Sequence, residues 1–282
     1  MDFQVPTATR PPRTTTSADG TTIAFDVHAP GGDPSVGPLV VVVGGATNVR
    51  LHSSGFGDAL AAVGCTGVVY DRRGRGDSTD TQPYAVEREV EDLAAVVEAV
   101  RPGSTAVVAG FSSGAALALR AAAGGAPVSH VVPFEPPYRL PDSPPLPADY
   151  VERLEAFNAA GDRDGALEYF QVAAVGLPQE MVDGMKGTPM WHHVAEVAPT
   201  IVYDGYCLGG DDQSLPAALV AGLTQPVLAL ASTGSPPFLV EPARQVGALA
   251  PHGTFELVEG DFHTAPDDVL ATRIAAFASP AG

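Results

Sequence analysis

Short apolar runs alternate along the chain with segments whose apolar residues recur at helical spacing. The runs are rich in valine, as expected for strands that are buried on both faces of a sheet. They cover residues 38–43, 66–70, 105–109, 128–134, 226–232 and 254–258. The helical spacing predicts helices over 57–63, 85–100, 113–123, 242–249 and 267–278. This alternation predicts an α/β fold with a doubly wound, mostly parallel sheet.

Two parts of the chain depart from this alternation. Residues 13–17 and 21–28 flank Asp19-Gly20, which predicts a hairpin at the start of the sheet. Proline is frequent at 141–147, and the helical patterns that follow contain no strand; they cover 150–159, 164–175, 178–185 and 190–197. We therefore expect an α/β core over 1–139 and 216–282, with an inserted helical cap over 140–215. The cap would act as a lid above the carboxyl ends of the strands, where ligands bind in such sheets.

Charge and composition limit the partners of this chain. Its 282 residues carry 33 acidic and 15 basic side chains, for a net charge of −18. Such a chain repels nucleic acid and anionic membrane surfaces, so we expect a small-molecule partner. The first 20 residues lack the apolar core of a signal peptide, and two distant cysteines indicate reduced thiols. A cytoplasmic protein is expected, and its oligomeric state is left open.

The stretch Gly-Phe-Ser-Ser-Gly at 110–114 carries the first chemical signal. It stands between a predicted buried strand and a predicted helix, where a tight turn exposes its central serine. Glycine is needed on both sides because a Cβ atom would clash in such a turn. The position predicts that Ser112 is a nucleophile, the alternative being an ordinary loop serine.

A serine nucleophile needs a base that can accept its proton. His263 follows the last predicted strand and precedes the terminal helix, which makes it the candidate base. The other histidines lie in a hairpin strand, a mid-sheet strand, loops or a cap helix: His28, His52, His130, His192, His193 and His252. His192 and His193 are adjacent, so they point in different directions and form no metal pair.

Together these features resemble the α/β-hydrolase superfamily over nearly the whole chain. The resemblance rests on Gly44-Gly45-Ala46, the 70–78 stretch YDRRGRGDS, the turn at 110–114 and the late His263. It implies that the backbone N–H groups of Ala46 and Ser113 form an oxyanion hole, and that no cofactor or metal is used. A serine at position 112 argues against the relatives with an aspartate nucleophile, the epoxide hydrolases and haloalkane dehalogenases.

The acid of the expected triad departs from the common family pattern. Members usually place an aspartate after the penultimate strand, where this chain has Ser235. Glu135 follows the strand after the 113–123 helix, and its placement is similar to that of zearalenone-type lactonases. It preserves the order Ser, acid, His. Glu241 is the second candidate, and an ion-paired strand-end residue is the alternative reading of Glu135.

These roles predict a serine hydrolase that cleaves a small, largely apolar ester or lactone through an acyl-enzyme. An acyltransferase or cyclase with the same acyl-enzyme, and a non-catalytic ligand-sensing homologue, are the alternatives. The substrate is expected to be uncharged or weakly cationic. Aromatic side chains are expected to line its pocket: Phe111, Trp191, Tyr203 and Tyr206.

Overall fold

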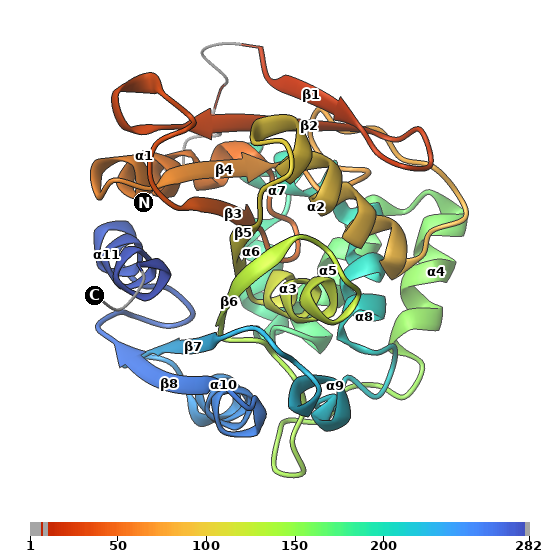
Figure 1. Cartoon of the computed structure of the whole chain (residues 1–282). Helices are drawn as coiled ribbons and strands as arrows, with labels where there is room; N and C mark the ends of the chain where they lie inside the picture. Colours follow the sequence, from red (N-terminus) through yellow and green to blue (C-terminus); the bar gives the residue numbers. More distant parts are fainter. Residues whose placement is uncertain (1–6, 8–10, 280–282) are drawn as a thin grey trace.

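Within the residues that the computed structural model describes, 7 and 11–279, eight strands form one sheet (Figure 1). Their order across the sheet is β1-β2-β4-β3-β5-β6-β7-β8, and the strands from β3 onward run parallel. The strands are β1 (Arg13–Thr16), β2 (Thr22–His28), β3 (Leu39–Val43), β4 (Thr66–Tyr70), β5 (Ala106–Phe111), β6 (Val128–Phe134), β7 (Val227–Ser232) and β8 (Gly253–Val258). The antiparallel β1–β2 hairpin forms one edge, and the predicted α/β fold is confirmed.

Helices on both faces explain why the central strands are apolar throughout. In Figure 1, α1 and α11 lie on one side of the sheet, and α2 and α3 lie on the other. The first pair buries Leu60 and Ile274 against the sheet, whereas the opposite core contains Leu93 and Leu117 together with Val246 of α10. These helices are α1 (Ser54–Ala62), α2 (Val86–Val100), α3 (Ser113–Ala123), α10 (Pro237–Leu249) and α11 (Asp267–Ala278).

The chain between β6 and β7 contains the helices that follow the proline-rich stretch. We call five of them, α4 to α8, the inserted helices. They are α4 (Tyr150–Ala160), α5 (Arg163–Ala173), α6 (Gln179–Met185), α7 (Pro189–Ala195) and α8 (Ile201–Leu208), with α9 (Ala217–Ala221) after them. The inserted helices share a small core of their own that includes Leu154, Leu167 and Ile201. The proposed domain division stays a prediction, because α8 also packs Cys207 and Leu208 into the sheet core beside α3.

Two helix starts differ from the sequence expectation. The helix predicted from residue 57 begins at Ser54, after the short 3₁₀ helix η2 (Arg50–Ser53). Gly57 is needed for packing rather than for a break, since a Cβ there would lie 2.5 Å from Cδ2 of His28. The helix predicted from Pro242 begins at Pro237 and keeps Pro242 inside it. Helix α8 was not predicted, and further 3₁₀ turns are η1 (Pro30–Gly32) and η3 (Ala198–Thr200).

Over residues 7 and 11–279, the structure contains no helix long and apolar enough to cross a membrane. The expected lack of a signal peptide rests partly on residues 1–6 and 8–10, which lie outside this range. The outer limits of the two predicted core segments, residues 1 and 282, also lie outside it.

Candidate active site

Ser112 occupies a strained turn between β5 and α3. Its φ of 55° and ψ of −126° lie where a residue with a side chain is rarely found. The flanking glycines explain how the chain passes through this turn. A Cβ on Gly110 would lie 2.3 Å from the Gly114 carbonyl oxygen, and one on Gly114 would lie 2.3 Å from the Val43 carbonyl oxygen. The local sequence therefore forces the serine out at the carboxyl end of β5.

Glu135 and His263 are in direct contact. Nδ1 of His263 lies 2.6 Å from Oε2 of Glu135, whose side chain is fully buried. The second oxygen, Oε1, accepts the backbone N–H of Ser232 at 2.7 Å. Both carboxylate oxygens thus have partners, as a buried charge requires. The imidazole is 29% exposed, so it joins a buried carboxylate to an open cavity.

Ser235 stands where relatives commonly have the triad aspartate. Its hydroxyl accepts the backbone N–H of His263 at 2.8 Å and lies 3.0 Å from the hydroxyl of Ser232. The backbone of His263 has a φ of 54°, a conformation that needs support from its surroundings. Ser235 therefore holds the backbone of the histidine, while Glu135 contacts the ring.

Two cavities meet at Ser112. One has a volume of about 400 Å³ and the other about 540 Å³, and both are lined by Ala46, Ser112, Phe170 and His263. Phe111 and Phe134 line the smaller cavity. No hydrogen bond joins the Ser112 hydroxyl to His263 among the described residues, and such contacts often tighten only when substrate is bound.

The two expected oxyanion-hole residues lie beside the serine. Ala46 lines both cavities, and Ser113 lines the larger one. The loop that carries Ala46 approaches closely, because a Cβ on Gly45 would lie only 2.9 Å from Cβ of Ser112. Ser113 is the first residue of α3, where backbone N–H groups lack intrahelical acceptors. Both residues thus lie beside Ser112, at the cavities that it lines.

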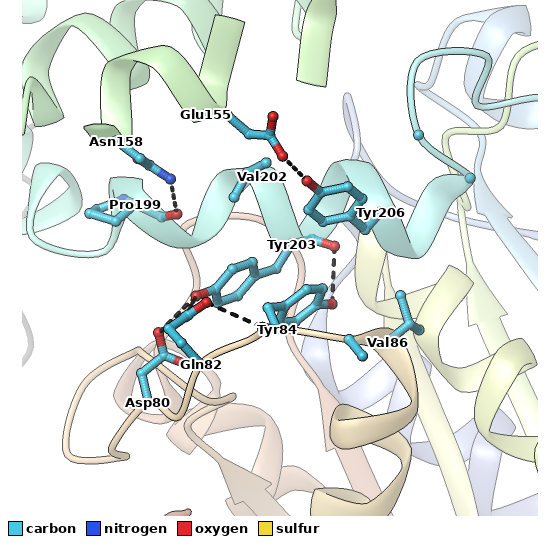
Figure 2. A pocket seen from close by; sticks show the side chains of 13 residues that line it. Asp80, Gln82, Tyr84, Val86, Glu155, Asn158, Pro199, Val202, Tyr203 and Tyr206 are labelled. Carbon is cyan, nitrogen blue, oxygen red and sulfur yellow. Dashed lines mark hydrogen bonds between the residues drawn. The ribbon is translucent and has the colours of Figure 1, made fainter. Parts of the chain in front are cut away.

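Three aromatic residues expected at this site lie elsewhere. Trp191 is buried among the inserted helices, where its Nε1 donates to Asp164 Oδ1 at 2.6 Å. Tyr203 and Tyr206 line a separate cavity of about 730 Å³, in which Tyr203 turns toward Gln82 (Figure 2). The helical period of α8 explains the difference, because another face of the helix lines the larger Ser112 cavity, with Asp204, Gly205 and Leu208.

Of the two remaining candidates, Phe111 lies at the Ser112 site and Glu241 does not. Phe111 lies at the site as expected, with its ring against Phe56 and Phe134. Glu241 lies on α10, and its Oε1 is 3.4 Å from Nε of Arg244 near the surface. Of the two acid candidates, only Glu135 contacts His263.

His52 lies at the site although it was not expected there from the sequence. It lines the smaller Ser112 cavity, and its Nε2 lies 3.2 Å from Nε2 of His193 on α7. Desolvation of the imidazole and the neighbouring His193 lower the pKa of His52, although part of its surface stays exposed. Its position in the loop after β3, at the carboxyl edge of the sheet, was the one signal that could have identified it. Across residues 7 and 11–279, no group of three or more His, Cys, Asp and Glu side chains is arranged to hold a metal ion.

Comparison with known proteins agrees with this architecture. The model of the Alpha/beta hydrolase family matches residues 39–272. An alpha/beta hydrolase from Sphaerobacter thermophilus DSM 20745 is 41% identical, with a TM-score of 0.84 over 95% of this chain and 100% of that one. No curated protein matches the chain.

More distant structures share the fold. An esterase from Rhodococcus sp. ECU1013 is 20% identical, with a TM-score of 0.65 over 97% of this chain and 100% of its own. An N-formylmaleamic acid deformylase from Pseudomonas putida S16 is 22% identical, with a TM-score of 0.62 over 94% of this chain and 100% of its own. The same architecture therefore occurs in proteins with different activities.

Proposed function

The chain belongs to the α/β-hydrolase family, and we propose that it is a serine hydrolase acting on a small, largely apolar carboxylic ester or lactone through an acyl-enzyme. One observation carries the proposal. Ser112 sits on a strained turn that opens into the same cavities as His263, and His263 contacts a fully buried carboxylate. A strained serine beside a histidine that is oriented by a third group is the pattern of an activated nucleophile.

The proton path follows from the contact with Glu135. A hydrogen on Nδ1 donates to the carboxylate, which leaves Nε2 with a free lone pair. Nε2 takes the proton of Ser112 while Oγ forms a bond to the substrate carbonyl carbon. The oxyanion accepts the N–H groups of Ala46 and Ser113. Imidazolium then gives its proton to the leaving alkoxide, and water repeats the sequence to release the acid and free Ser112.

Because two cavities meet at Ser112, they favour a substrate that extends on both sides of its carbonyl group. Phe111 and Phe134 give the smaller cavity an aromatic lining. Phe238 and Leu239 contribute to the larger one, and Phe170 borders both. Apolar surface of this kind contributes roughly 25 cal/mol for each Å² that is removed from water. The acyl and alcohol portions would each occupy one cavity.

Covalent labelling tests this proposal. A fluorophosphonate probe should add one label to the wild-type protein at Ser112, as read by intact mass and peptide mapping. Ser112→Ala should remain unlabelled, whereas the matched variant Ser113→Ala keeps Ser112 and should be labelled. Label on the Ser112→Ala protein would mean that another residue is the nucleophile.

Turnover is measured separately on p-nitrophenyl esters of increasing acyl length and on macrolactones. Hydrolysis by the wild type and none by Ser112→Ala is expected. If the wild type is labelled but hydrolyses none of them, hydrolysis is contradicted and either acyl transfer or ligand sensing replaces it. Added hydroxylamine or alcohol then separates these two, since only an acyltransferase forms the new acyl product.

A further inference from the structure

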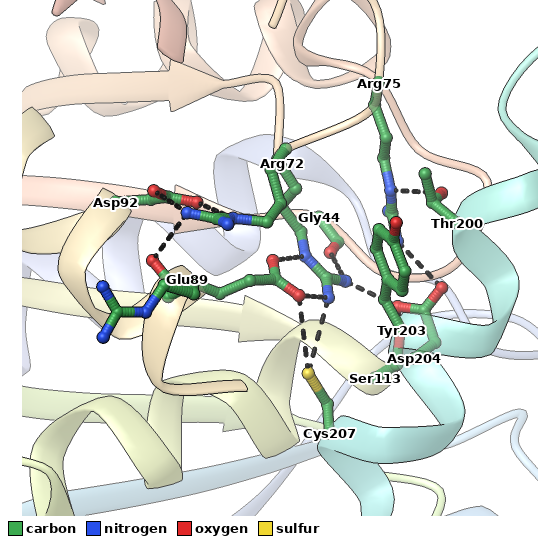
Figure 3. A network of polar contacts seen from close by, with 12 residues as sticks. Gly44, Arg72, Arg75, Glu89, Asp92, Ser113, Thr200, Tyr203, Asp204 and Cys207 are labelled. Carbon is green, nitrogen blue, oxygen red and sulfur yellow. Dashed lines mark hydrogen bonds and ion pairs between the residues drawn. The ribbon is translucent and has the colours of Figure 1, made fainter. Parts of the chain in front are cut away.

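Arginines of the turn after β4 are buried and converge on one carboxylate of the inserted helices. Figure 3 shows Arg72 and Arg75 reaching toward Asp204 of α8. Nη1 of Arg72 lies 2.5 Å from Oδ1 of Asp204, and Nη2 of Arg75 lies 2.8 Å from Oδ2. The three side chains are almost completely buried. The cost of removing these charges from water makes such a network weak evidence for stability. A role at the neighbouring site would give a reason for it.

Asp204 also holds the residue that follows the nucleophile. The hydroxyl of Ser113 donates to Oδ1 of Asp204 at 2.8 Å. Burial by itself would raise the pKa of Asp204, but Arg75 and Arg72 outweigh it and keep the pKa below its ordinary value. Asp204 is therefore a charged acceptor, and hydrogen bonds to charged acceptors are the stronger kind. It fixes Ser113, whose backbone N–H is one proposed oxyanion donor.

The same carboxylate reaches the second donor through Arg75. Nη1 of Arg75 donates to the carbonyl oxygen of Gly45 at 2.6 Å. This carbonyl and the N–H of Ala46 belong to one planar peptide group, so fixing the oxygen fixes the direction of the N–H. A cationic donor on the oxygen also polarises the peptide and makes its N–H a better donor. Nε of Arg75 is held by Thr200 at 2.9 Å, which leaves the guanidinium little freedom.

Building on the proposed serine hydrolase, we propose that Asp204 is a positioning residue that sets both N–H groups of the oxyanion hole. One of its oxygens orients Ser113 directly, and the other orients Ala46 through Arg75 and the Gly45 carbonyl. Because Asp204 lies on α8, the inserted helices complete the hole from outside the sheet. A displacement of α8 would thus weaken stabilisation of the transition state as well as reshape the cavity.

The test compares two substitutions of buried, arginine-paired aspartates. Asp204→Asn keeps the size of the side chain but removes its charge. Asp92→Asn does the same to the partner of Arg73, an arginine of the same turn. Nη2 and Nε of Arg73 lie 2.7 and 2.8 Å from the Asp92 carboxylate, and within the part of the chain that the structure describes this pair makes no hydrogen bond to Gly45 or Ser113. Asp204→Asn removes the charge that pairs with Arg72 and Arg75, and Asp92→Asn removes the charge that pairs with Arg73. A purely structural role therefore predicts a loss of stability in both variants and no selective loss of inhibitor affinity in Asp204→Asn. Thermal unfolding checks that each protein is folded at the assay temperature.

The readout is binding of an aryl trifluoromethyl ketone, whose hemiketal oxyanion on Ser112 occupies the hole. Asp204→Asn should weaken its inhibition about 10- to 100-fold and lower kcat by a similar factor, with KM within about threefold of wild type. Asp92→Asn should leave inhibitor affinity and kcat within about threefold of wild type. Ser113→Ala, which removes only the direct bond to Asp204, should weaken inhibition about 3- to 10-fold. If Asp204→Asn does not fold, the inhibition measured with Ser113→Ala tests the positioning role of Asp204.

The outcomes separate this proposal from the function on which it rests. Inhibitor binding that is as strong in Asp204→Asn and Ser113→Ala as in a reactive wild type would overturn the positioning role alone. The positioning role would also be overturned if Asp92→Asn lost as much affinity for the ketone as Asp204→Asn. A wild type whose Ser112 reacts with neither the ketone nor a fluorophosphonate would overturn the proposed hydrolase, and the positioning role with it.

Discussion

Glu135 and His263 come from the carboxyl ends of β6 and β8, and their side chains meet at 2.6 Å between Oε2 and Nδ1. Strand β6 lies directly beside β5, which ends just before Ser112. The proposed acid therefore comes from the strand next to that of the proposed nucleophile, and not from the loop after β7. Ser235 in that loop has no carboxylate, and it supports the histidine backbone instead.

Replacing Glu135 by glutamine should reduce kcat by about 10³- to 10⁴-fold, because an amide can stabilise the wrong histidine tautomer and cannot offset its positive charge. KM should change little. Steady-state kinetics on a p-nitrophenyl ester measure the effect, and Glu241→Gln is the matched control at the other candidate acid. Full activity in Glu135→Gln would remove this residue from the mechanism, and a comparable loss in Glu241→Gln would shift the role toward α10.

The turn at Ser112 should not tolerate a methyl group on its second glycine. Gly114→Ala would place Cβ 2.3 Å from the Val43 carbonyl oxygen and 2.7 Å from that of Gly44. Both are backbone atoms, so the clash is relieved only if the backbone shifts. We expect the free energy of unfolding to fall by at least about 2 kcal/mol. Gly184→Ala is the control, since a Cβ in this exposed part of α6 meets nothing within 4 Å. It should be neutral or raise the free energy of unfolding by about 0.5–1 kcal/mol. Chemical denaturation measures both, and equal effects would contradict the steric argument.

The sheet and the position of Ser112 were predictable because their signals are local. Valine runs mark strands buried on both faces, and glycine, serine and glycine at 110–114 mark the tight turn between strand and helix. Glu135 and His263 could be nominated because each follows a predicted parallel strand, and the carboxyl ends of such strands share one edge. Their 2.6 Å contact spans 128 residues and required the structure.

The inserted helices were less predictable. Trp191 and Tyr203 carry the same aromatic signal whether they face a substrate or pack between helices, so composition could not assign them. Asp204 gave no signal, since its partners Arg72 and Ser113 are 132 and 91 residues away along the chain. Buried ion pairs of this kind depend on how α8 docks against α3, and no local pattern encodes that docking.

Acidification should destabilise the protein partly through His52. Desolvation of the imidazole and the nearby His193 lower the pKa of His52 in the folded state, so the unfolded chain binds a proton that the folded protein does not. The free energy of unfolding should therefore fall as pH drops from about 7.5 to about 5. In His52→Gln the free energy of unfolding should fall less over this pH range, because residue 52 no longer binds a proton on unfolding. The other titrating groups are the same in both proteins, so the difference between the two curves reports His52. Urea denaturation across this range provides the measurement, with His252→Gln as the control at a second histidine, on the loop before β8. Parallel curves for wild type and His52→Gln would contradict the prediction.

Phe170 and Trp191 should differ in what their loss affects. Phe170 lines both cavities at Ser112, so Phe170→Ala removes apolar contact from the substrate. We expect KM for long-chain and aryl esters to rise about 10-fold, with little change for acetate esters. Trp191 is only 3% exposed and packs among the inserted helices. Trp191→Ala should lower the free energy of unfolding by about 3–5 kcal/mol through the cavity that it leaves.

Kinetics of the folded fraction and denaturant unfolding, measured on both variants, distinguish the two roles. Under the proposed placement, the ratio of KM for a bulky ester to KM for an acetate ester changes in Phe170→Ala and stays near the wild-type value in Trp191→Ala. A selective rise in KM for Trp191→Ala would mean that this ring reaches the substrate when the inserted helices move. Equal KM changes for both esters in Phe170→Ala would mean that the bulky arm does not lie against this residue.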